Sequence, residues 1–179
     1  PGAYSHLAAK KIYPKSEFIS CNTFEDCFKT CFENEEYKTI IPVENSIAGR
    51  VADIQYLINK YKLQIYAEHF QEIKHNLMIL KDNEIKNIKS VRSHSQAISQ
   101  CQKLINSNKF EPIIAADTAG SAKYISEKKI KDEAAIASEL AANIYNLKIV
   151  KKNIEDSQSN VTRFLIMGKK KIHPEFKDK

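Results

Sequence analysis

Short apolar runs and amphipathic segments alternate along the chain. Four apolar runs have the length and composition of buried strands, and they lie at residues 39–43, 88–91, 112–116 and 134–137. Each is followed by small polar residues and then by a segment whose apolar side chains recur every three or four positions, as on one face of a helix. The first such helix is expected from about residue 49, and the four end near residues 61, 106, 127 and 145. This alternation predicts an α/β fold with mainly parallel strands.

Two longer strand-like stretches interrupt the alternation, at residues 63–80 and 161–167. We interpret them as the crossings between two lobes. The first lobe is then formed by residues 1–76 together with 158–179, and the second by residues 77–157. Because ligand sites are common between such lobes, an active cleft is expected there.

Polar side chains stand at each predicted junction between a strand and the following helix. The first turn of a helix has unpaired N–H groups, which a polar N-cap side chain satisfies. Suitable N-caps are Ser46, Ser93 or Ser95, Thr118 and Ser138. Capping alone explains any single junction, whereas several junctions meeting at one cleft would bind an anion. The segment Glu44-Asn45-Ser46 is the clearest candidate for ligand binding among these junctions. It directly follows an apolar strand, at the end where parallel sheets bind ligands.

Charge and composition narrow the function classes. The chain has 28 Lys+Arg against 22 Asp+Glu, a formal net charge of +6, but its only arginines are Arg50, Arg92 and Arg163. Nucleic-acid surfaces favour Arg, so we interpret the scattered lysines as a solvated face and expect no nucleic-acid partner. No apolar run of about twenty residues is present, so no membrane span is predicted. No basic-then-apolar leader opens the chain, which favours a cytoplasmic location.

Cysteine and histidine do not form a metal-binding pattern. Cys27 and Cys31 share one face of a predicted helix, but no further Cys or His stands at a suitable spacing, so free thiols and no metal are expected. His75 and His94 are isolated imidazoles, each more typical of a structural hydrogen bond than of a catalyst. The chain opens abruptly at Pro1-Gly2, and we expect further residues upstream.

The segment Asn160-Val161-Thr162-Arg163-Phe164 alternates polar and apolar residues before an apolar run. Side chains alternate between the two faces of a strand, so Asn160, Thr162 and Phe164 share one face while Val161 and Arg163 share the other. The segment is either an ordinary edge strand or a strand that presents Thr162 to the cleft beside Asn160.

Taken together, the motifs resemble those of prephenate dehydratases over nearly the whole chain and in the family's order. The matching segments are Pro1-Gly2-Ala3-Tyr4-Ser5, Pro42-Val43-Glu44-Asn45-Ser46 with Gly49, Lys74-His75-Asn76-Leu77, Ser93-His94-Ser95-Gln96-Ala97 with Gln100-Cys101, Asp117-Thr118-Ala119, Ala134-Ala135-Ile136-Ala137-Ser138, Ile154-Glu155-Asp156 and Asn160-Val161-Thr162-Arg163-Phe164. The chain departs from the pattern at Ala3, where the family has Thr, at Ser95, where it has Pro, and at Asp117, where it has Ser.

The resemblance implies a two-lobed α/β fold like that of type II periplasmic binding proteins, with the active site in the cleft between the lobes. It implies no metal or organic cofactor and a reaction that converts prephenate to phenylpyruvate, carbon dioxide and water in phenylalanine biosynthesis. It further implies a homodimer or homotetramer, and a phenylalanine effector only where a C-terminal ACT domain lies outside this chain. Arogenate dehydratase is the alternative activity, and a non-catalytic binding protein is a second alternative.

The resemblance also assigns residues. Thr162 is the expected catalytic residue, as a hydrogen-bond or proton donor to the leaving hydroxyl. The expected substrate-binding residues are Asn160, Glu44, Asn45, Ser46, Ser93, His94, Gln96, Thr118, Ala119, Arg163 and Phe164. Two of these residues have an argument against a substrate contact. The alternation turns Arg163 away from Thr162, and a structural ion pair would also explain this arginine. Glu44, if ionised, would repel a dianion.

Overall fold

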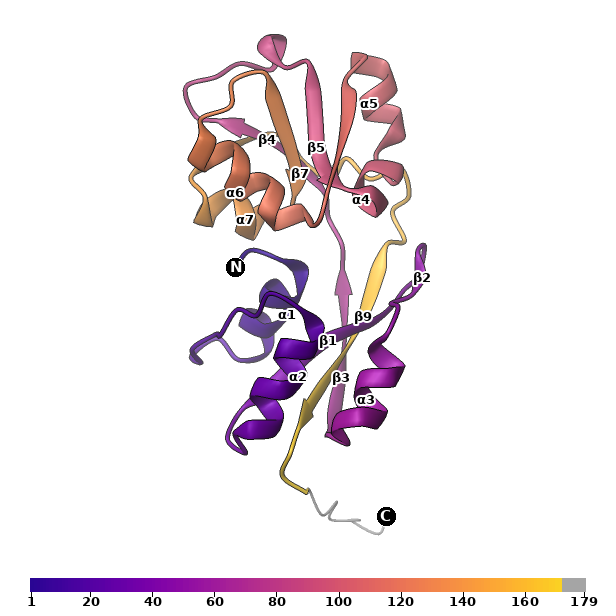
Figure 1. Cartoon of the computed structure of the whole chain (residues 1–179). Coiled ribbons are helices and arrows are strands. Elements are labelled where there is room, and N and C mark those ends of the chain that lie inside the picture. The colour runs from indigo at the N-terminus through magenta and orange to yellow at the C-terminus, as the bar shows by residue number, and fades with distance from the viewer. Residues whose placement is uncertain (172–179) are drawn as a thin grey trace. The chain divides into compact units, whose positions relative to one another are not determined.

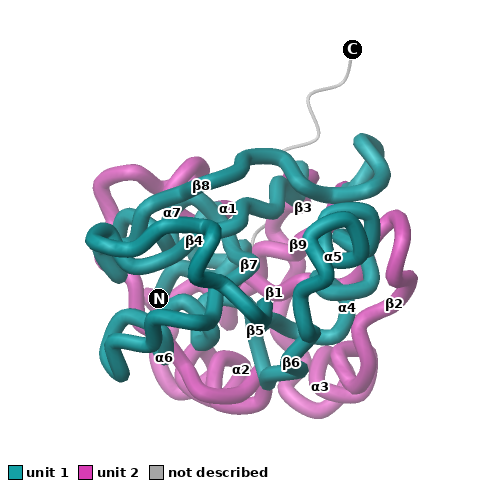
Figure 2. The backbone as a smooth tube through the Cα atoms, turned by 90° about the horizontal axis from the view of Figure 1, so that it is seen from above, with its two compact units in different colours: residues 1–7, 72–160 teal, residues 8–71, 161–179 magenta. Residues whose placement is uncertain are grey.

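The strands of the computed structural model belong to two separate sheets (Figure 1). The structure describes residues 1–171, and these form two compact units. Unit 1 contains residues 1–7 and 72–160, and unit 2 contains residues 8–71 and the chain from Val161 onward (Figure 2). The α/β class and the division into two lobes are therefore as predicted from the sequence, and the cleft between the lobes stays a prediction.

Unit 2 corresponds to the first predicted lobe, and unit 1 corresponds to the second. The boundaries between the units lie a few residues from those expected. Residues 1–7 go with unit 1, because the carbonyl of Gly2 accepts a hydrogen bond from Ser138 at 2.6 Å and the hydroxyl of Tyr4 bonds to the carbonyl of Lys74 at 3.0 Å. At the other end, Asn160 belongs to unit 1, where its amide donates to Gln100 at 2.8 Å.

Unit 2 is built on a four-stranded sheet in the order β2-β1-β9-β3. These strands are β1 (Lys38–Asn45), β2 (Gly49–Arg50), β3 (Gln64–Glu72) and β9 (Val161–Gly168). Strand β1 runs antiparallel to both β2 and β9. Helices α2 (Phe24–Glu33) and α3 (Ile54–Tyr61) place Phe28 and Leu57 in one apolar cluster with Met167 of β9. Helix α1 (Tyr4–Ile12) contains the boundary between residues 7 and 8.

Unit 1 is built on a five-stranded sheet in the order β6-β5-β7-β4-β8. These strands are β4 (Asn76–Leu80), β5 (Ser90–His94), β6 (Glu111–Ala115), β7 (Glu133–Ala137) and β8 (Leu147–Lys151). Strand β5 is parallel to β6 and β7, whereas β4 is antiparallel to β7 and β8. The expectation of mainly parallel strands is therefore wrong for unit 2 and only partly correct for unit 1. The prediction failed for β1 because its apolar run resembles a buried parallel strand, although β1 pairs antiparallel with both β2 and β9.

Helices cover both faces of this sheet. They are α4 (Ser95–Ser99), α5 (Gln102–Asn108), α6 (Thr118–Lys128) and α7 (Glu139–Ile144), and a short 3-10 turn, η1 (Ile85–Asn87), precedes β5. Alternate residues of β4 divide between two clusters: Leu77 packs with Ile98 and Ile105, and Met78 packs with Ile125 and Ala141. Each fully buried side chain of this size contributes roughly 1.5–3 kcal/mol, so the central strands anchor unit 1.

Several predicted helix starts are wrong. Residues 49–50 form β2 beside Glu44 and Asn45, so α3 begins at Ile54 and Ser46 is not its N-cap. The helix expected to end near 106 is two helices, and α4 is capped by His94, whose ring Nδ1 accepts from the N–H of Gln96, rather than by Ser93 or Ser95. Helix α6 is capped by Asp117 rather than Thr118. Ser138 caps α7 as expected. Within residues 1–171, no helix is both long and apolar enough to cross a membrane.

Candidate functional site

In unit 2, the end of β1 holds the start of β9. Asn45 lies directly across from Thr162 in the antiparallel register. The side-chain oxygen of Asn45 accepts hydrogen bonds from the N–H groups of Ile47 at 3.0 Å and Ala48 at 2.9 Å. Its amide nitrogen donates to the hydroxyl oxygen of Thr162 at 2.9 Å and to the carbonyl of Val161 at 3.3 Å. The tight turn after β1 therefore fixes which end of the Asn45 amide faces Thr162.

This contact determines what the Thr162 hydroxyl can do. Thr162 is 9% exposed, and its oxygen is the acceptor in the bond from Asn45. A threonine hydroxyl carries one hydrogen and two lone pairs, so accepting from Asn45 leaves that hydrogen available to a further acceptor. The geometry thus presents Thr162 as an oriented hydrogen-bond donor.

Ser46 strengthens the same junction. Its hydroxyl accepts from the N–H of Val161 at 3.0 Å, and its own N–H donates to the carbonyl of Val161 at 2.8 Å. Asn45 and Ser46 therefore bracket the residue that precedes Thr162. Two motifs more than a hundred residues apart in the sequence come together here.

The opposite face of this strand pair carries charge. Glu44 lies across from Arg163, and Arg163 donates to Glu68 of β3 at 2.6 Å. Neighbouring strand residues point to opposite faces, so Glu44 and Arg163 lie on the other side from Thr162. Phe164 is 1% exposed, on the face of Thr162. The ion-pair interpretation of Arg163 is therefore the one that the structure favours.

In unit 1, the expected residues gather where the parallel strands end. The ends of β5 and β6 are adjacent, because His94 pairs with Ala115. Ser93 is fully buried and donates to the carbonyl of Ile136 at 2.6 Å, so its hydrogen is used within the sheet. Gln96 is exposed, Thr118 is half-buried at the start of α6, and Ala119 is buried. These residues therefore lie at the carboxyl ends of β5 and β6, or in the helices that begin there.

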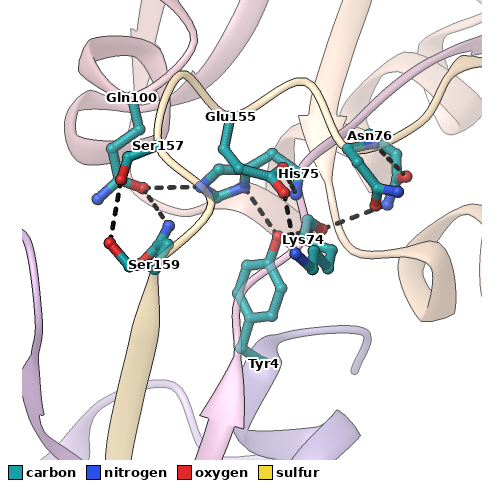
Figure 3. A network of polar contacts seen from close by, with 10 residues as sticks. Tyr4, Lys74, His75, Asn76, Gln100, Glu155, Ser157 and Ser159 are labelled. Atoms are coloured by element: carbon teal, nitrogen blue, oxygen red, sulfur yellow. Dashed lines mark hydrogen bonds and ion pairs between the residues drawn. The ribbon is translucent and has the colours of Figure 1, made fainter.

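A polar network in unit 1 contains residues that were not among the predicted site residues (Figure 3). The hydroxyl of Tyr4 lies 2.8 Å from Nδ1 of His75, and Nε2 of His75 lies 2.9 Å from Oε1 of Gln100. Asn160 donates from Nδ2 to the same Gln100 oxygen at 2.8 Å. Of the four residues, only Asn160 was predicted to bind substrate. The usable signal was the presence of Tyr4, His75 and Gln100 inside separate family motifs.

Glu155 ties a loop to this network. One carboxylate oxygen accepts from the N–H of His75 at 2.9 Å, and the other lies 3.5 Å from Nζ of Lys74. The Glu155 side chain is 3% exposed, so the pairing satisfies a buried charge. The N–H of Ile154 also donates to the carbonyl of His75 at 2.9 Å, which fixes the loop before Asn160 to unit 1.

Burial sets the protonation states in the network. Burial lowers the pKa of His75, against the opposing effects of the hydrogen bond to Gln100 and the charge of Glu155. Burial also raises the pKa of Tyr4 well above its ordinary value, and Cys101 and Glu155 raise it further. At neutral pH, therefore, both rings are uncharged. Among residues 1–171, no three His, Cys, Asp or Glu side chains are grouped so as to hold a metal ion.

Comparison with known proteins agrees with these motifs. A model of the family "Prephenate dehydratase" matches residues 1–172. The chain belongs to the prephenate dehydratase family. A relative from Arabidopsis thaliana, named arogenate dehydratase/prephenate dehydratase 2, chloroplastic, is 36% identical over 173 residues, which is 97% of this chain and 45% of the relative.

Two solved structures resemble this prephenate dehydratase domain. A protein described as GqqA, a novel type of quorum quenching acylase, is 33% identical with a TM-score of 0.90, over 97% of this chain and 63% of that one. The prephenate dehydratase of Staphylococcus aureus is 25% identical with a TM-score of 0.80, over 96% of this chain and 64% of that one. The chain spans about half the length of the curated relatives that it matches.

Proposed function

We propose that this chain catalyses the decarboxylating dehydration of prephenate to phenylpyruvate, carbon dioxide and water. The observation that carries the proposal is the Thr162 hydroxyl, which accepts from Asn45 and so keeps its hydrogen for a substrate. Membership of the prephenate dehydratase family supports it.

The reaction needs few groups, because aromatisation of the ring supplies the driving force. The bond between the ring and its carboxylate breaks, carbon dioxide leaves, and the electron pair enters the ring while the C–O bond to the hydroxyl breaks. The departing hydroxide takes one proton and becomes water, and the side-chain carboxylate stays on phenylpyruvate. A donor at the leaving oxygen therefore lowers the barrier, and such assistance is typically worth about 10²–10⁴-fold in rate.

Thr162 is assigned to this donor role. A threonine hydroxyl is a weak acid, so it acts as a positioned donor or as a relay from water rather than as a free acid. Asn45 contributes by orienting the hydroxyl. In this proposal Asn160 and Thr118 bind the substrate, and Ser46 stabilises the start of β9. Glu44 and Arg163 are left out of the reaction, because they lie on the opposite face of the strand pair.

Arogenate is the second candidate substrate, because the Arabidopsis relative is named for both activities. Arogenate differs from prephenate by an amine in place of the keto group, and the chemistry at the ring is the same. The ratio of kcat/KM for the two substrates decides between them.

The test of the main proposal is Thr162→Val, which replaces the hydroxyl by a methyl group at nearly constant volume. We expect kcat with prephenate to fall by about 10²–10⁴-fold. Thr162→Ser keeps the hydroxyl and should retain most of the turnover. A Thr162→Val protein with an unchanged circular dichroism spectrum and wild-type kcat would remove Thr162 from the mechanism.

We also propose a homodimer or homotetramer, as the family resemblance implies, and light scattering of the purified chain checks this oligomeric state. A cytoplasmic location is a separate part of the proposal. Regulation by phenylalanine is assigned to an ACT domain, where the whole protein carries one.

A further inference from the structure

None of the steps proposed for the reaction involves His75, although both ring nitrogens and both backbone polar groups of this residue have partners. It is 3% exposed, its Nδ1 faces the Tyr4 hydroxyl, and its Nε2 faces Gln100 (Figure 3). Its backbone N–H and carbonyl bond to Glu155 and Ile154. A neutral, buried imidazole with both nitrogens bonded has only two tautomers, and they place hydrogens differently.

The partners select one tautomer. Oε1 of Gln100 is an acceptor, and it already receives a hydrogen bond from Nδ2 of Asn160 at 2.8 Å. It can therefore face Nε2 of His75 only when Nε2 carries the hydrogen. Nδ1 is then an acceptor, and the Tyr4 hydroxyl donates to it at 2.8 Å. The hydrogens run from Tyr4 to His75 to Gln100.

The opposite tautomer would cost a hydrogen bond. With the hydrogen on Nδ1, a lone pair on Nε2 would face the lone pairs of Oε1 at 2.9 Å. Gln100 would have to turn its carboxamide over to restore the contact. Its nitrogen would then face Asn160 Nδ2, so that the Asn160 amide would have to turn as well. The state of His75 is thus coupled to the orientation of the Asn160 side chain.

Asn160 is where this coupling matters. Its backbone carbonyl accepts from the N–H of Ile73 at 2.8 Å, and its side chain is held by Gln100, so both ends of the residue are fixed. Thr162 follows two residues later in the chain. A change in the orientation of the Asn160 amide therefore alters a proposed substrate contact two residues before Thr162.

We propose that His75 is a positioning residue for the reaction: in its neutral, Nε2-protonated form it holds the Gln100 carboxamide, and through it the Asn160 amide, in the orientation that turnover requires. This inference rests on the proposed function. It assigns to Tyr4 the part of selecting the tautomer, by donating to Nδ1 of His75.

The kinetic test uses a pair of variants at His75. His75→Leu removes both ring nitrogens at similar volume, whereas the carboxamide of His75→Gln offers a donor to Gln100 and an acceptor to Tyr4. We expect His75→Leu to lower kcat roughly 10- to 100-fold, as for the loss of near-attack positioning, and His75→Gln to recover most of it. KM should change less than kcat. A purely structural role would lower the melting temperature of both variants and leave kcat of the folded protein unchanged.

The second test reads the tautomer directly and needs no activity. In protein labelled with ¹⁵N-histidine, the nitrogen shifts of His75 should show a hydrogen on Nε2 and none on Nδ1 at pH 7.5. Tyr4→Phe should shift the population toward the Nδ1–H form. Tyr66→Phe, which removes a hydroxyl that donates to the carbonyl of Lys170 at 2.8 Å, is the matched control and should leave the spectrum of His75 unchanged.

The outcomes separate the two claims. Wild-type protein that turns over neither prephenate nor arogenate would overturn the proposed function. If the wild-type protein turns over substrate and the two His75 variants have the same kcat as each other, only the positioning role is overturned. An Nδ1–H or doubly protonated His75 at pH 7.5 would overturn the direction of the chain, even if His75→Leu does not fold.

Discussion

In unit 2, Thr162 is held by a single amide, whereas in unit 1, Asn160 lies at the end of a chain of three further polar side chains. Asn45 takes its orientation from two backbone N–H groups of a turn. These N–H groups do not gain or lose protons as the pH changes. Asn160 takes its orientation from Gln100, His75 and Tyr4, and His75 can change its protonation. The orientation of Thr162 by Asn45 should therefore be sensitive to substitution but not to pH. The orientation of Asn160 should be sensitive to both.

The sharpest way to break the unit 2 arrangement is Asn45→Asp. The carboxylate can still accept from Ile47 and Ala48, but it cannot donate to Thr162. The Thr162 hydroxyl would then donate to Asp and lose the hydrogen meant for the substrate. We expect kcat/KM for prephenate to fall by about 10²–10³-fold, a loss comparable to removal of a preorganised donor.

A matched control exists in the same unit. The side-chain oxygen of Asn34 accepts from the N–H of Glu36 at 3.0 Å in an exposed turn. Asn34→Asp keeps that oxygen and changes the charge by the same amount, so kcat/KM should stay at the wild-type value. Equal activity of both variants would show that the Asn45 donor has no part in the reaction.

The sequence predicted how the side chains of β9 divide between the two faces of the sheet, but it did not predict the unit 1 network, and the reason is physical. Thr162 and Arg163 are consecutive residues of one strand, where alternation alone fixes which side chains share a face. Tyr4, His75 and Gln100 come from three separate elements, and only the packed sheet of unit 1 brings them together. Periodicity along one segment contains no information on such contacts.

The same reason explains the errors in topology. Apolar runs predicted the positions of β1, β5, β6 and β7, but they did not contain the direction of each neighbour. The antiparallel pairing of β1 with β9 is what places Asn45 opposite Thr162. Similarly, Ser46 has the side chain of an N-cap, yet it bonds to Val161, because β2 follows the turn.

Helix caps give a smaller test of the same contrast. Ser138 is 1% exposed; it accepts from the N–H of Ala141 at 3.1 Å and donates to the carbonyl of Gly2 at 2.6 Å. Ser138→Ala leaves both backbone groups without their partner, so we expect a loss of about 2 kcal/mol in the free energy of unfolding. Urea unfolding followed by circular dichroism measures it.

The comparison variant is Thr23→Ala in unit 2. Thr23 is exposed and accepts from the N–H of Asp26 at 3.0 Å in a capping box. Water can replace this bond, so we expect a loss of only about 1 kcal/mol. A Thr23→Ala variant that is less stable than Ser138→Ala would contradict the view that burial makes the unit 1 contacts the more costly to lose.

The smallest expected effect is a pH dependence of stability that comes from His75. Burial lowers the pKa of His75 in the folded chain below its ordinary value of 6.5. As pH falls below about 6.5, the unfolded chain therefore binds a proton at this site before the folded chain does. The free energy of unfolding should consequently rise with pH within the window between the lowered pKa and 6.5, and fall as the solution is acidified through it. His75→Gln removes the group, so urea unfolding of wild type and variant at pH 5 to 8 should give a shallower slope for the variant. Equal slopes would assign the pH dependence to other groups, and the neutral state of the Tyr4–His75–Gln100 chain would then lose its support from stability.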